Sequence, residues 1–134
     1  MFFKEIERRK NLKELINDIC ETIQKNNIKV SYLFVSIGHP DNKKLSIGVA
    51  NKSEDGNINL SHMAYSYEQH GFTPPSYPRD FARKLAQQMG LHFEESNQLA
   101  RDGERHLRGY FLASDEYIQL LEEREMKKNN LRRC

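Results

Sequence analysis

Residues 28–38, IKVSYLFVSIG, form the most apolar run in the chain and decide its fold. Both alternating sets of side chains are apolar, with Tyr32 and Phe34 in one set and Leu33 and Val35 in the other. Because a strand turns successive side chains to opposite faces, this pattern is typical of a strand that is covered on both faces. We predict that this run is the central strand of the sheet and that Leu33, Phe34 and Val35 are almost fully buried.

Two more strand-like segments follow this run. KKLSIGVAN covers residues 43–51 and NINLSHMAYSY covers residues 57–67, and both alternate apolar with small or polar residues. Residues 39–42 and 53–56 separate the three segments and are rich in residue types that favour tight turns. The sequence therefore predicts a three-stranded antiparallel meander.

Residues 2–26 precede the meander and read as an amphipathic helix. Its apolar stripe includes Leu15, Ile19 and Ile23, which we expect to pack across one face of the sheet. Phe2 and Phe3 lie near its start, somewhat out of phase with this stripe. They favour an alternative in which the N-terminal helix also docks on a partner or forms a homodimer.

Two further helices are predicted from their end signals. Residues 79–89 carry apolar side chains at steps of four, with Pro78 suited to the first turn and Gly90 to the end. Ser114 is a suitable N-cap for a last helix that has acidic residues in its first turn. We expect this helix to fray from about Lys128.

Residues 91–113 permit two interpretations. In the first they form a hairpin whose turn is Ala100–Gly103, because Asp-Gly is favourable turn chemistry. In the second, Glu94–Arg105 forms a helix that is followed by a short strand. The first interpretation gives an α+β fold: a mostly antiparallel sheet, made of the meander and a second hairpin, packed by N-terminal, middle and C-terminal helices.

Length and charge favour one domain with a basic end. The chain has 134 residues, which suits a single domain over residues 1–127 and a basic tail over 128–134. The total net charge is +2, and residues 124–134 carry five basic residues and one acidic residue. The remaining chain is therefore net negative, −2, which argues against a folded body that binds nucleic acid through its charge alone.

The cysteines and the apolar runs bear on the compartment. Cys20 and Cys134 have no short spacing between them, so they predict neither a zinc site nor a disulfide framework. No apolar run is long enough for a signal peptide or a membrane span. These features predict a cytoplasmic protein that does not enter membranes.

Residues 68–78, EQHGFTPPSYP, form the clearest loop, since three prolines and a glycine exclude a helix or a central strand. Phe72 and Tyr77 are aromatic residues on a stiff backbone, and His70 precedes them. Rigid aromatic anchors lose little entropy on binding, so this loop suits recognition of a partner. We assign His70, Phe72 and Tyr77 as predicted partner-binding residues.

ARKLAQQMGL, residues 82–91, resembles the first helix and turn of a helix-turn-helix, which would extend over residues 82–99. The resemblance implies nucleic-acid contacts by four basic residues. These are Arg83, Lys84, Arg105 and Arg108. Ser96 departs from the motif, because the second helix needs an apolar residue at that position to pack on the first. Acidic residues among the arginines also oppose phosphate contacts.

Enzyme chemistry has no local motif in this sequence. The five histidines form no zinc-binding pair, and the glycines form no phosphate loop. We therefore predict no catalytic residue, metal ligand or cofactor, although a site assembled from distant residues, such as His62 with Glu68, stays open.

The function favoured by the sequence is a small non-enzymatic protein-binding module. An accessory, inhibitor, immunity-type or chaperone-like factor would fit this description, acting through the proline and aromatic loop and the helix faces. A nucleic-acid-binding protein that uses residues 82–99 and the basic tail is the first alternative, and a small enzyme is the second.

Overall fold

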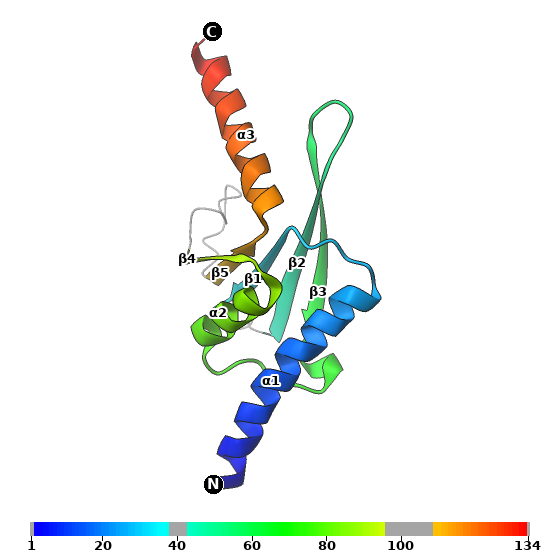
Figure 1. Ribbon diagram of the computed structural model, residues 1–134, viewed down its shortest axis with the longest axis vertical. Helices are drawn as coiled ribbons and strands as arrows, with labels where there is room; N and C mark the ends of the chain where they lie inside the picture. The colour runs from blue at the N-terminus through cyan, green and yellow to red at the C-terminus, as the bar shows by residue number, and fades with distance from the viewer. Residues whose placement is uncertain (1, 38–42, 96–108, 134) are drawn as a thin grey trace.

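The computed structural model describes residues 2–37, 43–95 and 109–133, and the surroundings of side chains within 12–37, 43–95 and 109–126. These residues form three α-helices and one five-stranded antiparallel sheet with the strand order β3-β2-β1-β5-β4 (Figure 1). The architecture confirms the predicted α+β fold. Its elements are α1 (Phe2–Lys25), β1 (Tyr32–Ser36), β2 (Lys44–Lys52), β3 (Ile58–Ser66), the 3₁₀ helix η2 (Glu68–His70), α2 (Pro78–Met89), β4 (His92–Glu95), β5 (Gly109–Ala113) and α3 (Asp115–Arg133).

β1 is the middle strand of the sheet, as the sequence predicted. It pairs with β2 along one side and with β5 along the other. Leu33 and Val35 face the helices and are 0% and 2% exposed, whereas Phe34 is buried on the opposite face. The burial prediction is confirmed for all three residues, and the pleat explains why Phe34 alone does not face α1.

Helices α1 and α2 cover one face of the sheet (Figure 1). Leu15, Ile19 and Ile23 are buried on α1, and Phe81 and Leu85 are buried on α2. These side chains form one cluster with the inward-facing residues of the central strands. The predicted packing of the first helix through its apolar stripe is therefore confirmed.

The helix ends follow the predicted signals. Pro78 occupies the first turn of α2, and Gly90 ends it in the left-handed conformation with φ 67°. Asn27 lies two residues after the end of α1 and has φ 52°, a value that asparagine tolerates better than most residues. The N–H of Tyr117 donates to Oγ of Ser114 over 3.1 Å, which confirms Ser114 as the cap of α3.

A smaller aromatic cluster lies on the sheet face away from α1 and α2. Tyr32, Phe34 and Phe111 are buried there, and Tyr117 at the start of α3 packs against them. The ring centroids of Phe34 and Phe111 are 4.7 Å apart. Gly48 lies opposite Tyr32 on β2, and a Cβ at this position would overlap the tyrosine ring. Glycine at 48 therefore gives the ring its space.

β4 and β5 form an antiparallel pair in which Phe93 lies opposite Leu112. The hairpin interpretation of residues 91–113 is confirmed at these two strands. The alternative helix over Glu94–Arg105 is wrong at its start, because Glu94 and Glu95 are extended. The predicted turn Ala100–Gly103 lies outside the described residues.

β2 and β3 pair along nine residues each and meet in a tight turn near Gly56, whose φ is 84°. Met63 and Tyr65 face the helices, and the His62 ring lies against Tyr32 on the other face, with centroids 6.0 Å apart. Burial of the Tyr65 side chain fixes which face of β3 turns inward.

α3 extends away from the sheet, and the N-terminal half of α1 extends in the opposite direction (Figure 1). Near its middle, α3 meets the tip of the β2–β3 hairpin, where Nζ of Lys52 lies 3.6 Å from Oε2 of Glu123. The helical backbone runs on to Arg133, beyond Lys128, where we expected fraying to begin. Basic residues suit a helix C-terminus because they interact favourably with its dipole. Among the described residues, no helix combines the length and apolar character that crossing a bilayer requires.

Candidate functional site

The three predicted partner-binding residues lie on one connection but have different surroundings. Nδ1 of His70 lies 2.8 Å from Oδ2 of Asp18 on α1. Phe72 is half-buried and packs against the main core. Tyr77 directly precedes α2 and is 73% exposed. Only Tyr77 therefore offers most of its aromatic ring to a partner.

The loop that carries Tyr77 is fixed at both ends by backbone hydrogen bonds. The N–H of Phe72 donates to the carbonyl of Tyr67 over 2.8 Å. The carbonyl of Tyr77 accepts the N–H of Phe81 over 3.0 Å, so the first turn of α2 holds the loop's other end. The prolines between them restrict φ, which leaves the exposed ring on a stiff backbone.

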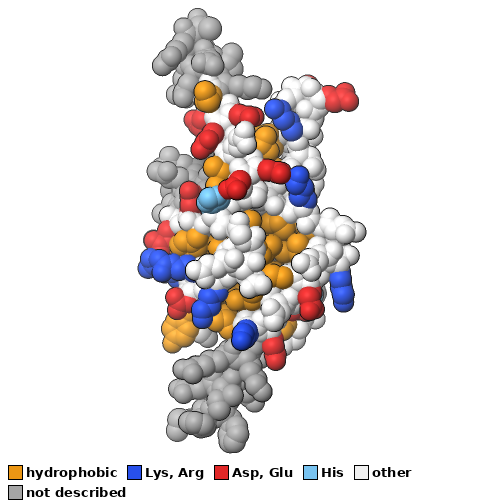
Figure 2. Space-filling view, in the orientation of Figure 1, with side chains coloured by type: hydrophobic (Ala, Val, Ile, Leu, Met, Phe, Trp, Pro, Cys, Tyr) orange, Lys and Arg blue, Asp and Glu red, His pale blue; other side chains and the backbone are white. Residues whose placement is uncertain are grey.

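A pocket of about 210 Å³ opens between this loop and α1. It is lined by Leu12, Leu15, Thr73, Pro74, Pro75, Ser76, Tyr77, Asp80 and Lys84. The two leucines and two prolines supply an apolar lining, and Asp80 and Lys84 add charges of opposite sign one helical turn apart. Figure 2 shows patches of hydrophobic side chains at the surface formed by α1, α2 and their connections, with charged side chains around them.

Sequence reasoning found the loop side of this pocket but not its helix side. Leu12 and Leu15 belong to the apolar stripe of the first helix, which the sequence assigned entirely to the core. Leu15 is fully buried, but Leu12 is only half-buried and lies at the edge of the packed region. Leu12 stands at the start of the buried stripe, and this end position was the sequence signal that its side chain could line a pocket.

A second polar cluster joins α1 to β3 and η2. The hydroxyl of Tyr65 donates to Oδ2 of Asp18 over 2.6 Å, and the His70 ring stacks on Tyr65 with centroids 4.1 Å apart. Burial, and next the hydrogen bond with Asp18, raise the pKa of the Tyr65 phenol. The cluster therefore keeps Tyr65 protonated and fastens the end of β3 to α1. Asp18 and Tyr65 are 47 positions apart, so no local sequence pattern indicates this contact.

The described residues offer little for enzyme chemistry. No group of three histidine, cysteine, aspartate or glutamate side chains within them is placed to hold a metal ion. Burial raises the pKa of the Cys20 thiol, so the nucleophilic thiolate is disfavoured. His62, considered from sequence together with Glu68, instead contacts Tyr32.

The predicted nucleic-acid residues have mixed outcomes. The Arg83 guanidinium lies 5.5 Å from the centroid of the Phe93 ring, so part of it is engaged within the domain. Lys84 lines the pocket beside Tyr77. Arg105 and Arg108 lie outside the described residues. The helix-turn-helix interpretation is wrong at residues 92–95, because the chain enters β4 after Gly90 where a second helix was expected.

Comparison with known proteins gives this site no precedent: no family model matches the chain, and no curated protein or solved structure is significantly similar to it.

Proposed function

We propose that the chain is a small non-enzymatic protein-binding module that captures a partner at the pocket between α1 and the proline-rich loop. The observation that carries this proposal is the 73% exposure of Tyr77 beside a partly apolar pocket. Large aromatic side chains on a solvent-facing surface are enriched among residues that dominate protein interfaces.

The stiffness of the loop supports the proposal. A flexible loop would lose conformational freedom when a partner ordered it, and that loss would weaken binding. Here Pro74, Pro75 and Pro78 restrict the backbone, and hydrogen bonds fix both ends of the segment. The Tyr77 ring therefore contributes contact area with little entropy lost from its backbone.

The pocket's lining indicates the chemistry of the partner. Its volume of about 210 Å³ suits one large apolar side chain. Leu12, Pro74 and the Tyr77 ring would surround that side chain, and Asp80 and Lys84 would meet polar groups beside it. A partner segment with one exposed leucine, methionine or phenylalanine, flanked by polar residues, fits this description.

The decisive experiment compares Tyr77→Ala with Phe72→Ala. Each variant is tested for capture of partners from the native host and for thermal unfolding. Tyr77→Ala should abolish capture while the unfolding free energy changes by less than about 0.5 kcal/mol, because the ring is largely exposed. Phe72→Ala should instead destabilise the fold by roughly 1–3 kcal/mol, because that ring packs on the core.

Tyr77→Phe is the matched control, since it keeps the ring and removes only the hydroxyl. It should retain most of the capture if the ring surface carries the contact. Unchanged capture by a folded Tyr77→Ala variant would refute the proposal.

A further inference from the structure

β3 forms one edge of the sheet, and the sequence leaves this edge unprotected. None of its nine residues, Ile58–Ser66, is aspartate, glutamate, lysine, arginine, proline or glycine. It pairs with β2 in one continuous register. Edge strands are usually protected by charges, prolines or bulges, because their free N–H and C=O groups can pair with another chain. A long edge without these features is suited to strand addition.

The hydrogen bonds at the two ends of the β2–β3 ladder reveal which backbone groups are free. The N–H of Ser53 donates to the carbonyl of Asn57 over 2.8 Å, and the N–H of Tyr67 donates to the carbonyl of Lys43 over 3.4 Å. Hydrogen-bonded pairs alternate with non-bonded pairs in an antiparallel ladder. The odd-numbered residues of β3 therefore bond to β2, and the even-numbered residues face outward.

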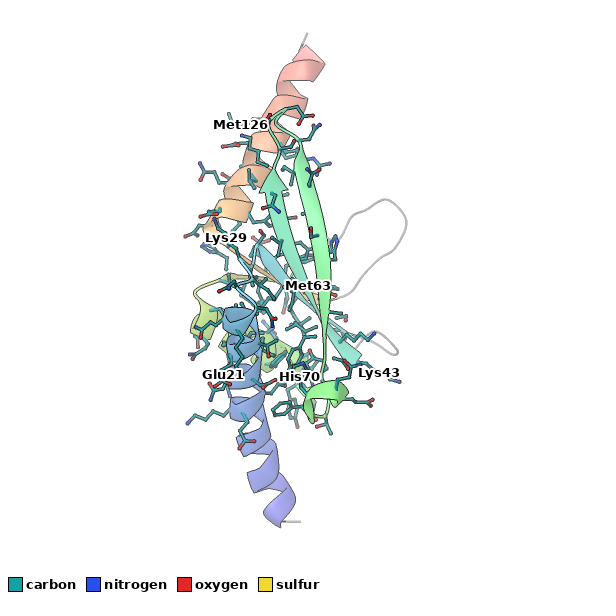
Figure 3. All side chains as sticks on the ribbon, turned by 90° about the vertical axis from the view of Figure 1, so that its right-hand side faces the viewer. Glu21, Lys29, Lys43, Met63, His70 and Met126 are labelled. Carbon is teal, nitrogen blue, oxygen red and sulfur yellow. The ribbon has the colours of Figure 1, made fainter. Side chains whose placement is uncertain are left out.

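Leu60, His62 and Ala64 consequently direct their N–H and C=O groups to the free edge. Their side chains lie on the sheet face away from α1, as the contact of His62 with Tyr32 demonstrates. Figure 3 shows β3 along its length with α1 to one side of the sheet, and Figure 1 places β3 at the sheet's outer margin. No other described strand pairs with this edge.

A groove of about 710 Å³ accompanies this edge on the helix side. It is lined by Thr22, Asn26, Asn27, Ile28, Lys29, Ile47, Val49, Ser61, Met63, Ala64, Tyr65 and His70. Met63 is 42% exposed there, and Ile28 and Val49 are half-buried. An added strand would turn every second side chain toward this apolar surface and toward the end of α1.

We propose that β3 and this groove bind an extended segment of another protein, which adds to the sheet as an antiparallel sixth strand. Main-chain hydrogen bonds to Leu60, His62 and Ala64 would supply affinity, and the groove would select apolar side chains at alternate positions. The groove lining contains Lys29 but no aspartate or glutamate. Nζ of Lys29 lies 3.0 Å from Oε2 of Glu116, so this lysine is already paired, and the groove favours apolar side chains at the positions that enter it.

A single segment fits this edge better than a second copy of the chain. Two copies that paired through their β3 strands would be related by a twofold axis perpendicular to the joined sheet. The helices of both copies would then lie on the same face of that sheet. Each copy would then bring the C-terminal end of its α1 to the same junction, because this end forms the groove wall beside β3. A peptide strand has no such helix and avoids that crowding.

The test uses a labelled, capped nine-residue peptide with valine at alternate positions and threonine, serine or glutamate between them. Valines that enter the groove have their own N–H groups turned away from β3 in antiparallel pairing. N-methylation of the residues between the valines should therefore abolish binding, whereas N-methylation of the valines should preserve it. Equal binding by both methylated peptides, or no binding by the unmodified peptide, would overturn the proposal. If only the peptide with N-methylated valines failed to bind, the proposed antiparallel pairing with β3 would be overturned.

Protein variants locate the binding to this edge. Leu60→Pro removes an outward N–H that the β2 ladder does not use, and it should weaken peptide binding roughly tenfold or more. Met63→Lys should also weaken binding, because it places a charge in the groove without changing the backbone. Both variants should keep the wild-type circular dichroism spectrum, and full peptide binding by both would contradict the proposal.

Two controls separate this site from its alternatives. Tyr77→Ala should bind the peptide normally, so failure of the pocket function and failure of this proposal remain distinguishable. Light scattering on the wild-type chain tests the second copy. A dimer that Leu60→Pro dissociates would assign the edge to self-association and overturn the proposed occupant.

Discussion

The two edges of the sheet differ in nearly every property that controls pairing. β3 has nine residues and no formal charge, whereas β4 has four residues, two of which are Glu94 and Glu95. Glu95 forms an ion pair with Arg79 on α2, with Nε and Oε1 3.0 Å apart, and His92 contacts Asp115 on α3. β4 is thus short, charged and tied to neighbouring helices.

This contrast teaches that edge protection in the molecule is local. Charges and short strands prevent an edge from pairing with other chains, and β4 has both. β3 belongs to the same sheet and has neither, although a lysine at one outward position would have been enough to deter pairing. We infer that the difference reflects different uses of the two edges.

The largest expected effect on stability comes from a substitution in β1, the strand that joins the two halves of the sheet. Leu33 on β1 is fully buried, and β1 joins the β2–β3 half of the sheet to the β5–β4 half. Leu33→Ala should lower the unfolding free energy by about 2–5 kcal/mol, through lost burial and a new cavity. Urea denaturation measures the loss of unfolding free energy, and hydrogen exchange measures whether both edges of the sheet lose protection. Selective loss at one edge would contradict a shared, cooperative sheet.

Proline substitutions at neighbouring residues sharpen the assignment of the free edge. Ser61→Pro removes an N–H that bonds to β2 and should cost roughly 2–3 kcal/mol. Leu60→Pro removes an N–H that faces outward and should cost less than about 1 kcal/mol. Urea denaturation of both variants gives the comparison. The reverse order would show that the outward residues of β3 are the odd-numbered ones.

The anchored end of β3 provides a smaller effect that depends on pH. Burial and the bond with Asp18 raise the pKa of Tyr65 above its ordinary value of about 10, and burial raises that of Tyr67. A raised folded pKa means that protonation stabilises the fold fully below pH ~10, and this stabilisation is lost as pH rises further. Ultraviolet titration should therefore find Tyr65 and Tyr67 un-ionised above pH ~10 until the chain unfolds.

Tyr65→Phe supplies the matching control for that titration. It should remove one late-ionising tyrosine and lower the unfolding free energy at neutral pH by about 1 kcal/mol, because one hydrogen bond to Asp18 is lost. If the number of late-ionising tyrosines is unchanged in this variant, the late ionisation does not belong to Tyr65.

The smallest effect on stability is expected at β4. Replacing Glu94 and Glu95 by threonine removes the strand's charges and one exposed ion pair, which should change the unfolding free energy by less than about 1 kcal/mol. Light scattering should detect more self-association, because β4 loses its protection. Glu14→Thr, an exposed change on α1, is the control. Equal self-association of the β4 variant and the control variant would mean that charge does not protect β4.

The fold was predictable where one residue pattern had one physical solution. The doubly apolar run around Leu33 allowed only a covered strand, and the Pro78 and Gly90 signals defined α2. The inward face of β3 was not predictable, because both sides of this strand have mixed polarity. Only the three-dimensional burial of Tyr65 fixes the inward side.

The candidate site was predictable only in its local part. The proline and aromatic loop was visible in the sequence, but the contrast between buried Phe72 and exposed Tyr77 depends on how the loop meets the core. The free edge of β3 depends on strand order, which local patterns do not specify. Pairing of β1 with β5, 73 or more positions later, leaves β3 on the outside.

The opposite directions of α1 and α3 have a consequence for how the molecule tumbles. Both helices extend along the long axis of the particle (Figure 1), so end-over-end rotation is slower than rotation about that axis. The N–H bonds of a helix are roughly parallel to the helix axis, whereas the N–H bonds of a strand are roughly perpendicular to the strand. The ratio of transverse to longitudinal ¹⁵N relaxation rates should therefore be higher in α1 and α3 than in β2 and β3, even where these elements are equally rigid.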